Sequence, residues 1–389
     1  MTEVVIAGAC RTPVGKYGRA FRNVEAVKLG SVVVAEAINR AGLVGADVEE
    51  VILGNVIQAG LGQNPARQAA LMAGLPDRVA AVTVNKVCAS GMKSVAIAAD
   101  AIRAGSAEVL VAGGMESMSR APYLVKEARW GVGYNHVQFL DAMLHDGLWD
   151  VYNQFHMGIT GEIVSERFHV SREDQDAFAI ESQRRAGRAT QDGGFRAEIV
   201  PVDVPGGPRI EVDEGIRYDT SAEKIAKLPP VFRQGGLITA GNASQLSDGA
   251  SAMVVLSSDA AKRHGIEPMA RILDYVTAGT KPEWVMEAPI PAVRKLLKRT
   301  GLSIEDFDLF EHNEAYAAAS VAVMRELGIP HERLNVNGGA VALGHPLGCS
   351  GARILTTLLY AMKARSAKRG LATLCLGGGN AMAMAIERA

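Results

Sequence analysis

The chain is poor in cysteine and has almost no excess of charge. Its four cysteines among 389 residues, Cys10, Cys88, Cys349 and Cys375, form no Cys-x-x-Cys pair. This scatter argues against a disulfide framework or a zinc site and fits a reducing cytosol, so we expect a cytoplasmic protein. The formal net charge is −1, which indicates neither a nucleic-acid partner nor a membrane-surface partner.

Long apolar runs and common ligand motifs are also absent from the sequence. No run reaches the ~18 apolar residues of a membrane span, and the N-terminus lacks the regions of a signal peptide. Gly60-Leu61-Gly62 begins like a dinucleotide fingerprint, but Pro65 stands in place of the last glycine. Tyr17 follows Gly15-Lys16, which excludes a P-loop. No His, Asp and Glu cluster has metal-ligand spacing, so we expect no metal.

Glycine-rich segments surround three side chains that could act as reagents. Cys88 lies in Asn-Lys-Val-Cys-Ala-Ser-Gly, His345 lies in Gly-His-Pro-Leu-Gly, and Cys375 precedes Gly377-Gly378-Gly379. Glycine lets backbone approach a ligand closely and exposes N–H groups that could stabilise an oxyanion. Two cysteines and a histidine in this setting suggest a site that uses thiols as reagents.

A diverged internal repeat organises the two ends of the chain. Ser90-Gly91 opens a predicted helix that reaches Arg103, and a strand follows over residues 108–112. Ser350-Gly351 opens a second predicted helix that reaches Lys363, and a strand follows over residues 371–376. The alternation of strands and helices implies parallel sheets covered by helices. We therefore expect two α/β halves that pack together.

The segment between the halves has a more irregular pattern. Residues 204–208 form a clear turn, and Ser171 with the acidic residues after it predicts a helix that runs to about Thr190. A long irregular insertion in an α/β protein is usually a lid or a binding loop. We divide the chain into an N-terminal half (1–117), an inserted loop domain (118–247) and a C-terminal half (248–389).

The local sequence leaves two interpretations of each candidate reagent. Cys88 follows a predicted strand and precedes a helix, and the positive end of the helix dipole would stabilise its thiolate. The alternative is a buried structural cysteine, the commoner case for a free thiol. Pro346 disfavours helical conformation at His345 and helps fix its ring, but the histidine could also be an ordinary loop residue. Cys375 could be the filler of a buried strand.

At these residues the chain resembles the thiolases, enzymes that make and break carbon–carbon bonds in acyl-coenzyme A thioesters. The matching segments are those around Cys88, His345 and Cys375, and the resemblance covers the whole chain. It implies two thiolase-type α/β halves, with mixed sheets covered by helices, and a loop domain inserted after the first half. It also implies coenzyme A and acyl-CoA as substrates, with no tightly bound cofactor.

The resemblance implies a role for each reagent. Cys88 would take the acyl group as a thioester, and His345 would activate this thiol and donate a hydrogen bond to a thioester oxygen. Cys375 would be the general acid and base of the condensation. The N–H groups of Cys88 and Gly377 would form one oxyanion hole, and Asn313 would hold a water in the other. Cys10 and Cys349 occupy no family catalytic position and are expected to be structural.

Coenzyme A would be bound mainly by the inserted loop domain. Arg217 falls where the family has a phosphate-contacting arginine, although a solvated loop arginine is the alternative. Ser244 matches the serine that hydrogen-bonds pantetheine. Tyr218 replaces a frequent histidine, Tyr316 replaces a commoner phenylalanine, and His312 before Asn313 is unusual. The other matching tunnel positions are Leu148, His156, Met157, Phe232, Ala315 and Tyr316.

Three functional hypotheses follow. The segments 146–148 and 156–158 resemble short-chain biosynthetic thiolases, which favours the condensation of two acetyl-CoA molecules. A 3-ketoacyl-CoA thiolase of fatty-acid degradation is the second hypothesis, because the segment 242–246 occurs in degradative members too. A non-enzymatic acyl-CoA binder is disfavoured because it has no need for two reactive thiols. We expect a homotetramer, with a dimer as the alternative, held partly by the segment around residues 118–142.

Overall fold

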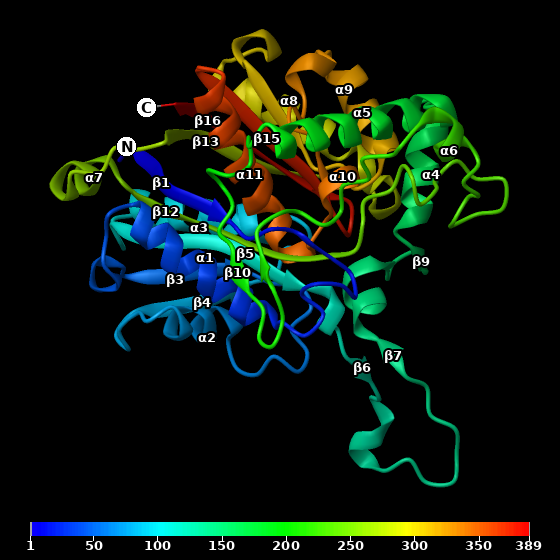
Figure 1. Ribbon diagram of the computed structural model, residues 1–389, viewed down its shortest axis with the longest axis horizontal. Helices are drawn as coiled ribbons and strands as arrows, with labels where there is room; N and C mark the ends of the chain where they lie inside the picture. Colours follow the sequence, from blue (N-terminus) through cyan, green and yellow to red (C-terminus); the bar gives the residue numbers. More distant parts are fainter. Residues whose placement is uncertain (1, 389) are drawn as a thin grey trace.

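The computed structural model describes residues 2–388, and its centre is one mixed β-sheet of ten strands. Nine strands follow one another from edge to edge: β14 (Leu309–His312), β15 (Arg369–Leu376), β16 (Asn380–Arg388), β13 (Ala270–Gly279), β1 (Val4–Arg11), β12 (Ser247–Ser257), β5 (Val109–Ser117), β3 (Glu50–Gly54) and β4 (Ala80–Val84). The tenth, β2 (Gly15–Lys16), pairs with β12. The two sides of the sheet meet where β1 pairs with β13 over two residue pairs (Figure 1).

The strand directions correct the expectation of parallel sheets. β3 runs parallel to β4 and β5, and β14 runs parallel to β15, but the other neighbours in the sheet are antiparallel. The cause is visible at Gly377–Gly379, where a tight turn joins β15 directly to β16. A chain that turns back this sharply can pair only antiparallel, since a parallel return needs a crossover of a dozen or more residues. The mixed α/β class is confirmed.

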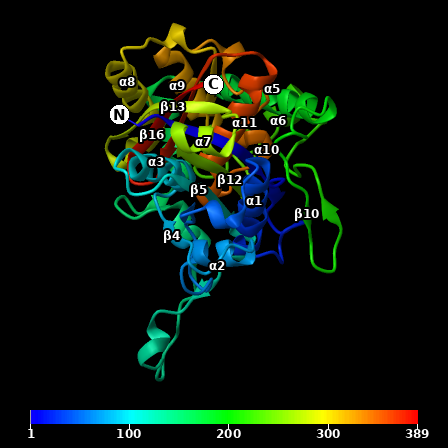
Figure 2. The same ribbon diagram turned by 90° about the vertical axis from the view of Figure 1, so that its left-hand side faces the viewer.

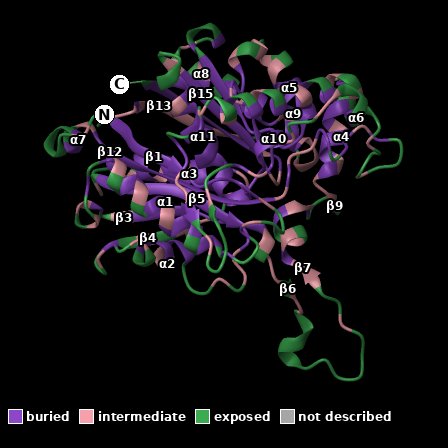
Figure 3. Ribbon diagram, in the orientation of Figure 1, coloured by how far each residue is buried: buried purple, intermediate pink, exposed green. Residues whose placement is uncertain are grey.

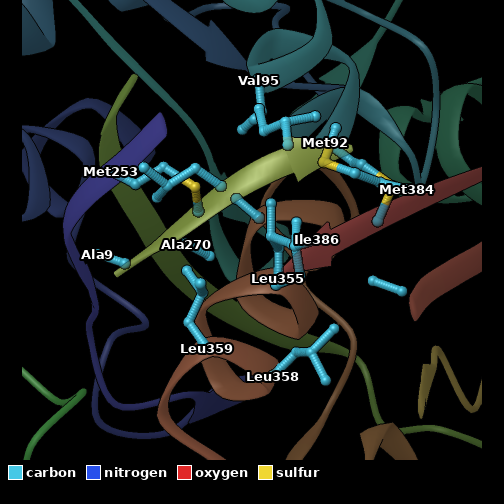
Figure 4. Packing of buried hydrophobic residues seen from close by; sticks show 14 of the residues in the cluster. Ala9, Met92, Val95, Met253, Ala270, Leu355, Leu358, Leu359, Met384 and Ile386 are labelled. Carbon is cyan, nitrogen blue, oxygen red and sulfur yellow. The ribbon is translucent and has the colours of Figure 1, made fainter. Parts of the chain in front are cut away.

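Helices cover the sheet in three layers. Alternate residues of β1 and β12 face opposite ways: Val5 and Val254 pack with helix α1 (Ala26–Arg40), whereas Ile6 and Val255 pack with the central helices. The central helices are α3 (Ser90–Arg103) and α11 (Leu347–Ala364), whose apolar side chains meet between the two sides of the molecule (Figure 4). Helices α8 (Pro289–Thr300) and α9 (Ala317–Leu327) cover the remaining outer face, and α2 (Pro65–Met72) packs beside α1.

The repeat predicted from sequence is present, with two shifted boundaries. Helix α11 begins at Leu347, immediately after Pro346, so Ser350 lies inside its first turn instead of opening it. Strand β5 continues through Gly113 and Gly114 to Ser117. A β-carbon on Gly114 would lie 2.0 Å from the carbonyl oxygen of Gly348. Glycine is needed in this strand because the start of α11 lies directly against it.

The inserted segment contains short hairpins and three helices. Its elements are β6 (Tyr123–Leu124), β7 (Leu140–Asp141), β8 (Trp149–Asp150), β9 (Phe155–His156), α4 (Gly158–Arg167), α5 (Arg172–Gln191), β10 (Val202–Asp203), β11 (Arg209–Ile210) and α6 (Ala222–Ala226). The predicted cap of α5 is confirmed, because the Ser171 hydroxyl accepts the Asp174 N–H and the Asp174 carboxylate accepts the Ser171 N–H. The predicted turn at 204–208 joins β10 to β11.

Two parts of this insertion stand out. The β6–β7 arm projects away from the body (Figures 1 and 2), and its tip is exposed (Figure 3). Residues Met143–Leu148 form a π-helical turn, a rare geometry that is frequent at functional sites. The remaining helices are α7 (Ser258–His264) and α10 (Ala340–Leu343). Within residues 2–388, none of the helices has both the length and the apolar character needed to cross a bilayer.

Candidate active site

Cys88 lies in a tight turn between β4 and α3. The turn places Val87 at φ +47, an unusual conformation for a β-branched residue. Ser90 holds it, because the Ser90 hydroxyl accepts the Lys86 N–H at 2.8 Å and donates to the Val87 carbonyl at 2.6 Å. The result is a sulfur fixed at the start of α3, the location predicted from sequence.

Cys375 lies near the end of β15, just before the glycine turn. Gly378 and Gly379 both have positive φ, +85 and +78, which favours glycine at each. A β-carbon on Gly379 would also lie 2.6 Å from the Thr280 carbonyl oxygen. The turn holds Cys375 and Gly377 on one side of the sheet edge, and the Cys375 sulfur lies 3.6 Å from the sulfur of Met286.

His345 is fixed by the backbone on both sides. Gly344 has φ +112, and a β-carbon there would lie 2.1 Å from the Ser247 hydroxyl, so only glycine fits before the histidine. The His345 N–H donates to the Gln245 carbonyl at 3.0 Å. Pro346 then caps α11. The side chain is buried, which excludes the surface-loop alternative.

The hydrogen bonds of His345 determine its tautomer. The Ser350 hydroxyl lies 2.5 Å from His345 Nδ1 and 2.8 Å from the Pro346 carbonyl oxygen. Because a carbonyl can only accept, the single hydroxyl proton goes to Pro346, and Nδ1 must carry the proton donated to Ser350. Nε2 of the neutral ring is therefore an acceptor, and the Asn313 amide nitrogen lies 3.3 Å from it.

A buried carboxylate links the loops around these residues. Glu116 on β5 accepts the backbone N–H groups of Val56, Ile57 and Gly348 at 3.0, 3.2 and 2.9 Å, and the Asn55 amide at 2.8 Å. Burial raises the pKa of Glu116 to about 7, and these donors partly offset the effect. The carboxylate thus ties the start of α11 to the end of β3.

One narrow cavity of about 50 Å³ joins most of the predicted residues. Nine of them line it: Cys88, Leu148, Met157, Ser244, Ala315, Tyr316, His345, Cys375 and Gly377. They come from both halves of the chain and from the insertion, so the cavity exists only in the assembled fold. Asn313, at the end of β14, does not line the cavity but reaches it through His345 Nε2.

The other predicted residues lie outside this cavity. His156 stacks on Phe232 with ring centroids 4.6 Å apart, and Phe232 meets the edge of Tyr316 at 6.1 Å. These rings support the cavity wall from behind. Arg217 lies in a separate groove beside α5, where its guanidinium donates to the Ala240 carbonyl at 2.9 Å.

Burial is the largest influence on the pKa values of the two thiols. It raises the pKa of Cys88 to about 12, although the N–H groups of Gly377 and Cys88 lower it in part. In the free protein, desolvation outweighs the hydrogen bonds that favour the Cys88 thiolate, which runs against the expected stabilisation. Burial and the neighbouring Cys88 also raise the pKa of Cys375. Burial lowers the pKa of His345 to about 3, so the ring is neutral and can accept a proton.

The other two cysteines and the Glu314 carboxylate have structural surroundings. Cys10 and Cys349 are buried and do not line the cavity. Glu314 accepts hydrogen bonds from Ser182, Asn335 and the Val341 N–H at 2.7, 2.8 and 3.0 Å, as a structural carboxylate does. Within residues 2–388, no group of three or more His, Cys, Asp or Glu side chains has a metal-binding arrangement.

Sequence reasoning missed several residues of the site. Val285, Leu347 and Leu376 complete the apolar wall, and none carries a chemical signal that could single it out. Ser350 was recognised only as a helix start, although it is the partner of His345. Its position five residues after the histidine, on the first turn of a helix, is the signal that could have identified it.

Two family models together match nearly the whole chain. The thiolase N-terminal domain matches residues 4–259, and the thiolase C-terminal domain matches residues 266–388. The chain belongs to the thiolase family. Among curated relatives, an acetyl-CoA acetyltransferase of Pseudomonas aeruginosa is 50% identical and a probable acetyl-CoA acyltransferase of Staphylococcus aureus is 49% identical, each over 100% of both chains.

A solved thiolase structure is similar over its full length. The crystal structure of the Bacillus anthracis acetyl-CoA acetyltransferase superposes with a TM-score of 0.98 at 43% identity. The match covers 100% of this thiolase and 99% of the other chain. The expected fold of two thiolase-type halves with an insertion is therefore confirmed.

Proposed function

We propose that this thiolase is an acetyl-CoA C-acetyltransferase, which condenses two acetyl-CoA molecules reversibly to acetoacetyl-CoA and coenzyme A. The observation that carries the proposal is the meeting of Cys88, His345 and Cys375 in one cavity of about 50 Å³. A cavity this small favours a short acyl group. Relatives named acetyl-CoA acetyltransferase at 49–50% identity support the same activity.

The first half of the reaction transfers an acetyl group to Cys88. The Cys88 sulfur attacks the thioester carbonyl of acetyl-CoA while its proton passes to His345 Nε2, the bare acceptor nitrogen. The carbonyl oxygen becomes an oxyanion, which the N–H groups of Cys88 and Gly377 stabilise. Coenzyme A then leaves as a thiol with the proton from His345, and acetyl-Cys88 remains.

The second half forms the carbon–carbon bond. His345 Nε2 takes the proton of Cys375, and the Cys375 thiolate then removes a proton from the methyl carbon of a second acetyl-CoA. The resulting enolate oxygen accepts hydrogen bonds from the protonated His345 ring and from a water held by Asn313. The carbon attacks the acetyl-Cys88 carbonyl, the bond to sulfur breaks, and acetoacetyl-CoA is released. Cys375 keeps the proton from the methyl carbon, and His345 gives its proton to the Cys88 thiolate, which restores both thiols and the neutral ring.

Coenzyme A is a substrate in this scheme, and no tightly bound cofactor is needed. We propose that Ser244 and Leu148 contact the pantetheine arm, because both line the cavity that holds Cys88. The stacked pair His156 and Phe232 would keep Met157 and the adjoining wall in place. Arg217 would contact the phosphates farther out. The unit boundaries 1–117, 118–247 and 248–389, and a cytoplasmic location, stay predictions.

We also propose a homotetramer, with a dimer as the alternative. The β6–β7 arm carries large exposed apolar side chains, among them Trp130 at 91% and Phe139 at 70% exposure. Apolar groups gathered on a projecting arm favour a protein–protein contact. The expected contact segment is the one around residues 118–142.

The alternative is a 3-ketoacyl-CoA thiolase for longer chains of fatty-acid degradation. Relatives named probable acetyl-CoA acyltransferase, at 49% identity, are consistent with this alternative function. Thiolysis rates across 3-ketoacyl-CoA chain lengths separate the two: rates that fall beyond four carbons support acetoacetyl-CoA, and rates that rise to ten carbons support the alternative.

Acylation of Cys88 is the direct test of the mechanism. After incubation with acetyl-CoA, intact-protein mass spectrometry should show one added acetyl group on the wild-type chain and none on Cys88→Ala. Cys349→Ala, at a buried cysteine outside the cavity, is the matched control and should acetylate like the wild type. An acetyl label that persists in Cys88→Ala at the wild-type level would refute the assignment.

A further inference from the structure

The phenol of Tyr316 is a buried polar group that the catalytic scheme leaves without a role. Its ring lines the cavity that contains Cys88 and Cys375, and the residue is only 7% exposed. Within residues 2–388, no hydrogen bond to another group contributes to the pKa of its hydroxyl. A buried hydroxyl without a partner is unfavourable, so this one calls for a partner that forms during the reaction.

The ring is held at its base and along its side. A β-carbon on Gly161 of α4 would lie 3.1 Å from Cγ of Tyr316, so the missing side chain lets the base of the ring lie against this helix. Phe232 meets the ring edge-on, with centroids 6.1 Å apart and the planes at 87°. The Tyr316 backbone pairs with Ala243. These contacts leave the hydroxyl end as the part of the ring that can extend into the cavity.

The hydroxyl lies within electrostatic reach of both sulfurs. Burial raises the pKa of Tyr316 most, and the neighbouring Cys375 and Cys88 raise it further, with the larger contribution from Cys375. The phenol therefore keeps its proton during the reaction. It can offer that proton to an anion in a hydrogen bond without giving it up.

Cys375 needs such a donor once it has become a thiolate. In the resting enzyme its S–H donates to the sulfur of Met286 at 3.6 Å, and a thioether has no proton to donate to a thiolate. The one hydrogen bond that lowers the pKa of Cys375 comes from its own backbone N–H. Among residues 2–388, only Ser244 and Tyr316 bring a hydroxyl to the cavity wall. Ser244 lies where the pantetheine arm is proposed to bind, which leaves Tyr316 for the thiolate.

We propose that Tyr316 is a further catalytic residue, whose O–H donates a hydrogen bond to the Cys375 thiolate while this thiolate removes the methyl proton of acetyl-CoA. His345 Nε2 takes the S–H proton of Cys375, the phenol keeps its own proton, and no bond to the phenol oxygen forms or breaks. The phenol stabilises the base while the protonated His345 ring donates to the enolate oxygen. The proposal rests on the proposed function, because it assumes Cys375 as the base of that reaction.

The test follows the two half-reactions separately in Tyr316→Phe, which removes only the hydroxyl. Exchange of labelled coenzyme A into acetyl-CoA needs Cys88 and His345 and should keep the wild-type rate. Exchange of the methyl hydrogens of acetyl-CoA for deuterium in D₂O needs the Cys375 thiolate. It should slow by roughly ten- to hundredfold, the range for a hydrogen bond to a charged group. Deuterium exchange at the wild-type rate, or equal slowing of both exchanges, would overturn the assignment.

Tyr360→Phe is the matched control. The Tyr360 hydroxyl donates to the Ala9 carbonyl at 2.8 Å, and the residue lies on α11 outside the cavity. This variant loses a hydroxyl with a structural bond, so both exchange rates should equal those of the wild type. Slowing of deuterium exchange to the same extent as in Tyr316→Phe would show that the effect does not come from the cavity.

A reaction of Cys375 alone separates the phenol from the proposed function. In a Cys88→Ala background, adding Tyr316→Phe should slow alkylation of Cys375 by iodoacetamide, read by peptide mass spectrometry. The expected factor is roughly three to ten, because a less stabilised thiolate is rarer but also more nucleophilic. Equal alkylation with and without the hydroxyl, in an enzyme whose wild type cleaves acetoacetyl-CoA, would overturn the role of Tyr316 alone. Alkylation that depends on the hydroxyl, in a protein that cleaves no acetoacetyl-CoA, would overturn the proposed function instead.

Discussion

The hydrogen bond from His345 to Ser350 allows a quantitative prediction for Ser350→Ala. In the resting enzyme the bond joins two neutral groups, with Nδ1 of the ring 2.5 Å from the hydroxyl. When His345 takes the proton of Cys88, the ring becomes positive and the same bond becomes charge-assisted. Neutral hydrogen bonds contribute about 0.5–1.5 kcal/mol and those to charged groups about 1.5–3 kcal/mol. Only the difference, roughly 1–2 kcal/mol, acts on the transition state.

That difference sets the expected loss of activity. At about 1.4 kcal/mol for each factor of ten, Ser350→Ala should lower kcat for acetoacetyl-CoA thiolysis by roughly 5- to 30-fold. KM should change little, because Ser350 does not line the cavity. Alkylation of Cys88 by iodoacetamide, followed by peptide mass spectrometry, should slow as well, since it also requires the thiol to lose its proton.

Ser165→Ala is the matched control. Ser165 is a buried helical serine that donates to the carbonyl of Gly161, four residues earlier, and accepts the Gln175 amide. It repeats the bonding of Ser350, which donates to Pro346 and accepts from a ring nitrogen. Both variants should lose about 1 kcal/mol of stability, but only Ser350→Ala should lose kcat. Equal losses of kcat in the two variants, or full activity in Ser350→Ala, would refute the tautomer argument.

Four other predictions follow from the site and the surface. Cys375→Ala should still accept an acetyl group on Cys88 while forming no acetoacetyl-CoA; condensation at the wild-type rate would exclude Cys375 as the base. Arg217→Ala should weaken the use of coenzyme A thioesters by roughly 1–3 kcal/mol, and equal losses with short pantetheine thioesters would show that it does not touch the phosphates. Met157 lines the cavity with Tyr316 and Met286, so acetoacetyl-CoA should be the best thiolysis substrate. Met157→Ala should make six-carbon chains better substrates, since each methylene is worth ~1–3 kcal/mol of discrimination. An unchanged chain-length profile in this variant would contradict the assignment. Light scattering at micromolar concentration should give a tetramer, and a monomer would disprove the role of the 118–142 arm.

The sequence by itself determined the parts of this protein that depend on local chemistry. The cap at Ser171, the turn at 204–208 and the helix after Cys88 could be predicted because each depends on neighbouring residues along the chain. The family followed from short segments around Cys88, His345 and Cys375, and it brought the mixed α/β fold with it.

The tertiary structure decided what depends on distant residues. The pKa of Cys88 is raised because the assembled fold desolvates it, an effect that outweighs the nearby backbone N–H groups. Strand β5 lies directly against the start of α11, although the two elements are more than 200 residues apart in sequence. This close approach accounts for the continuation of β5 through Gly114 and for the start of α11 at Leu347. The cavity that joins Cys88 to His345 and Cys375 depends on the same kind of contact. Such contacts leave no local pattern, because the neighbours that create them are adjacent only after folding.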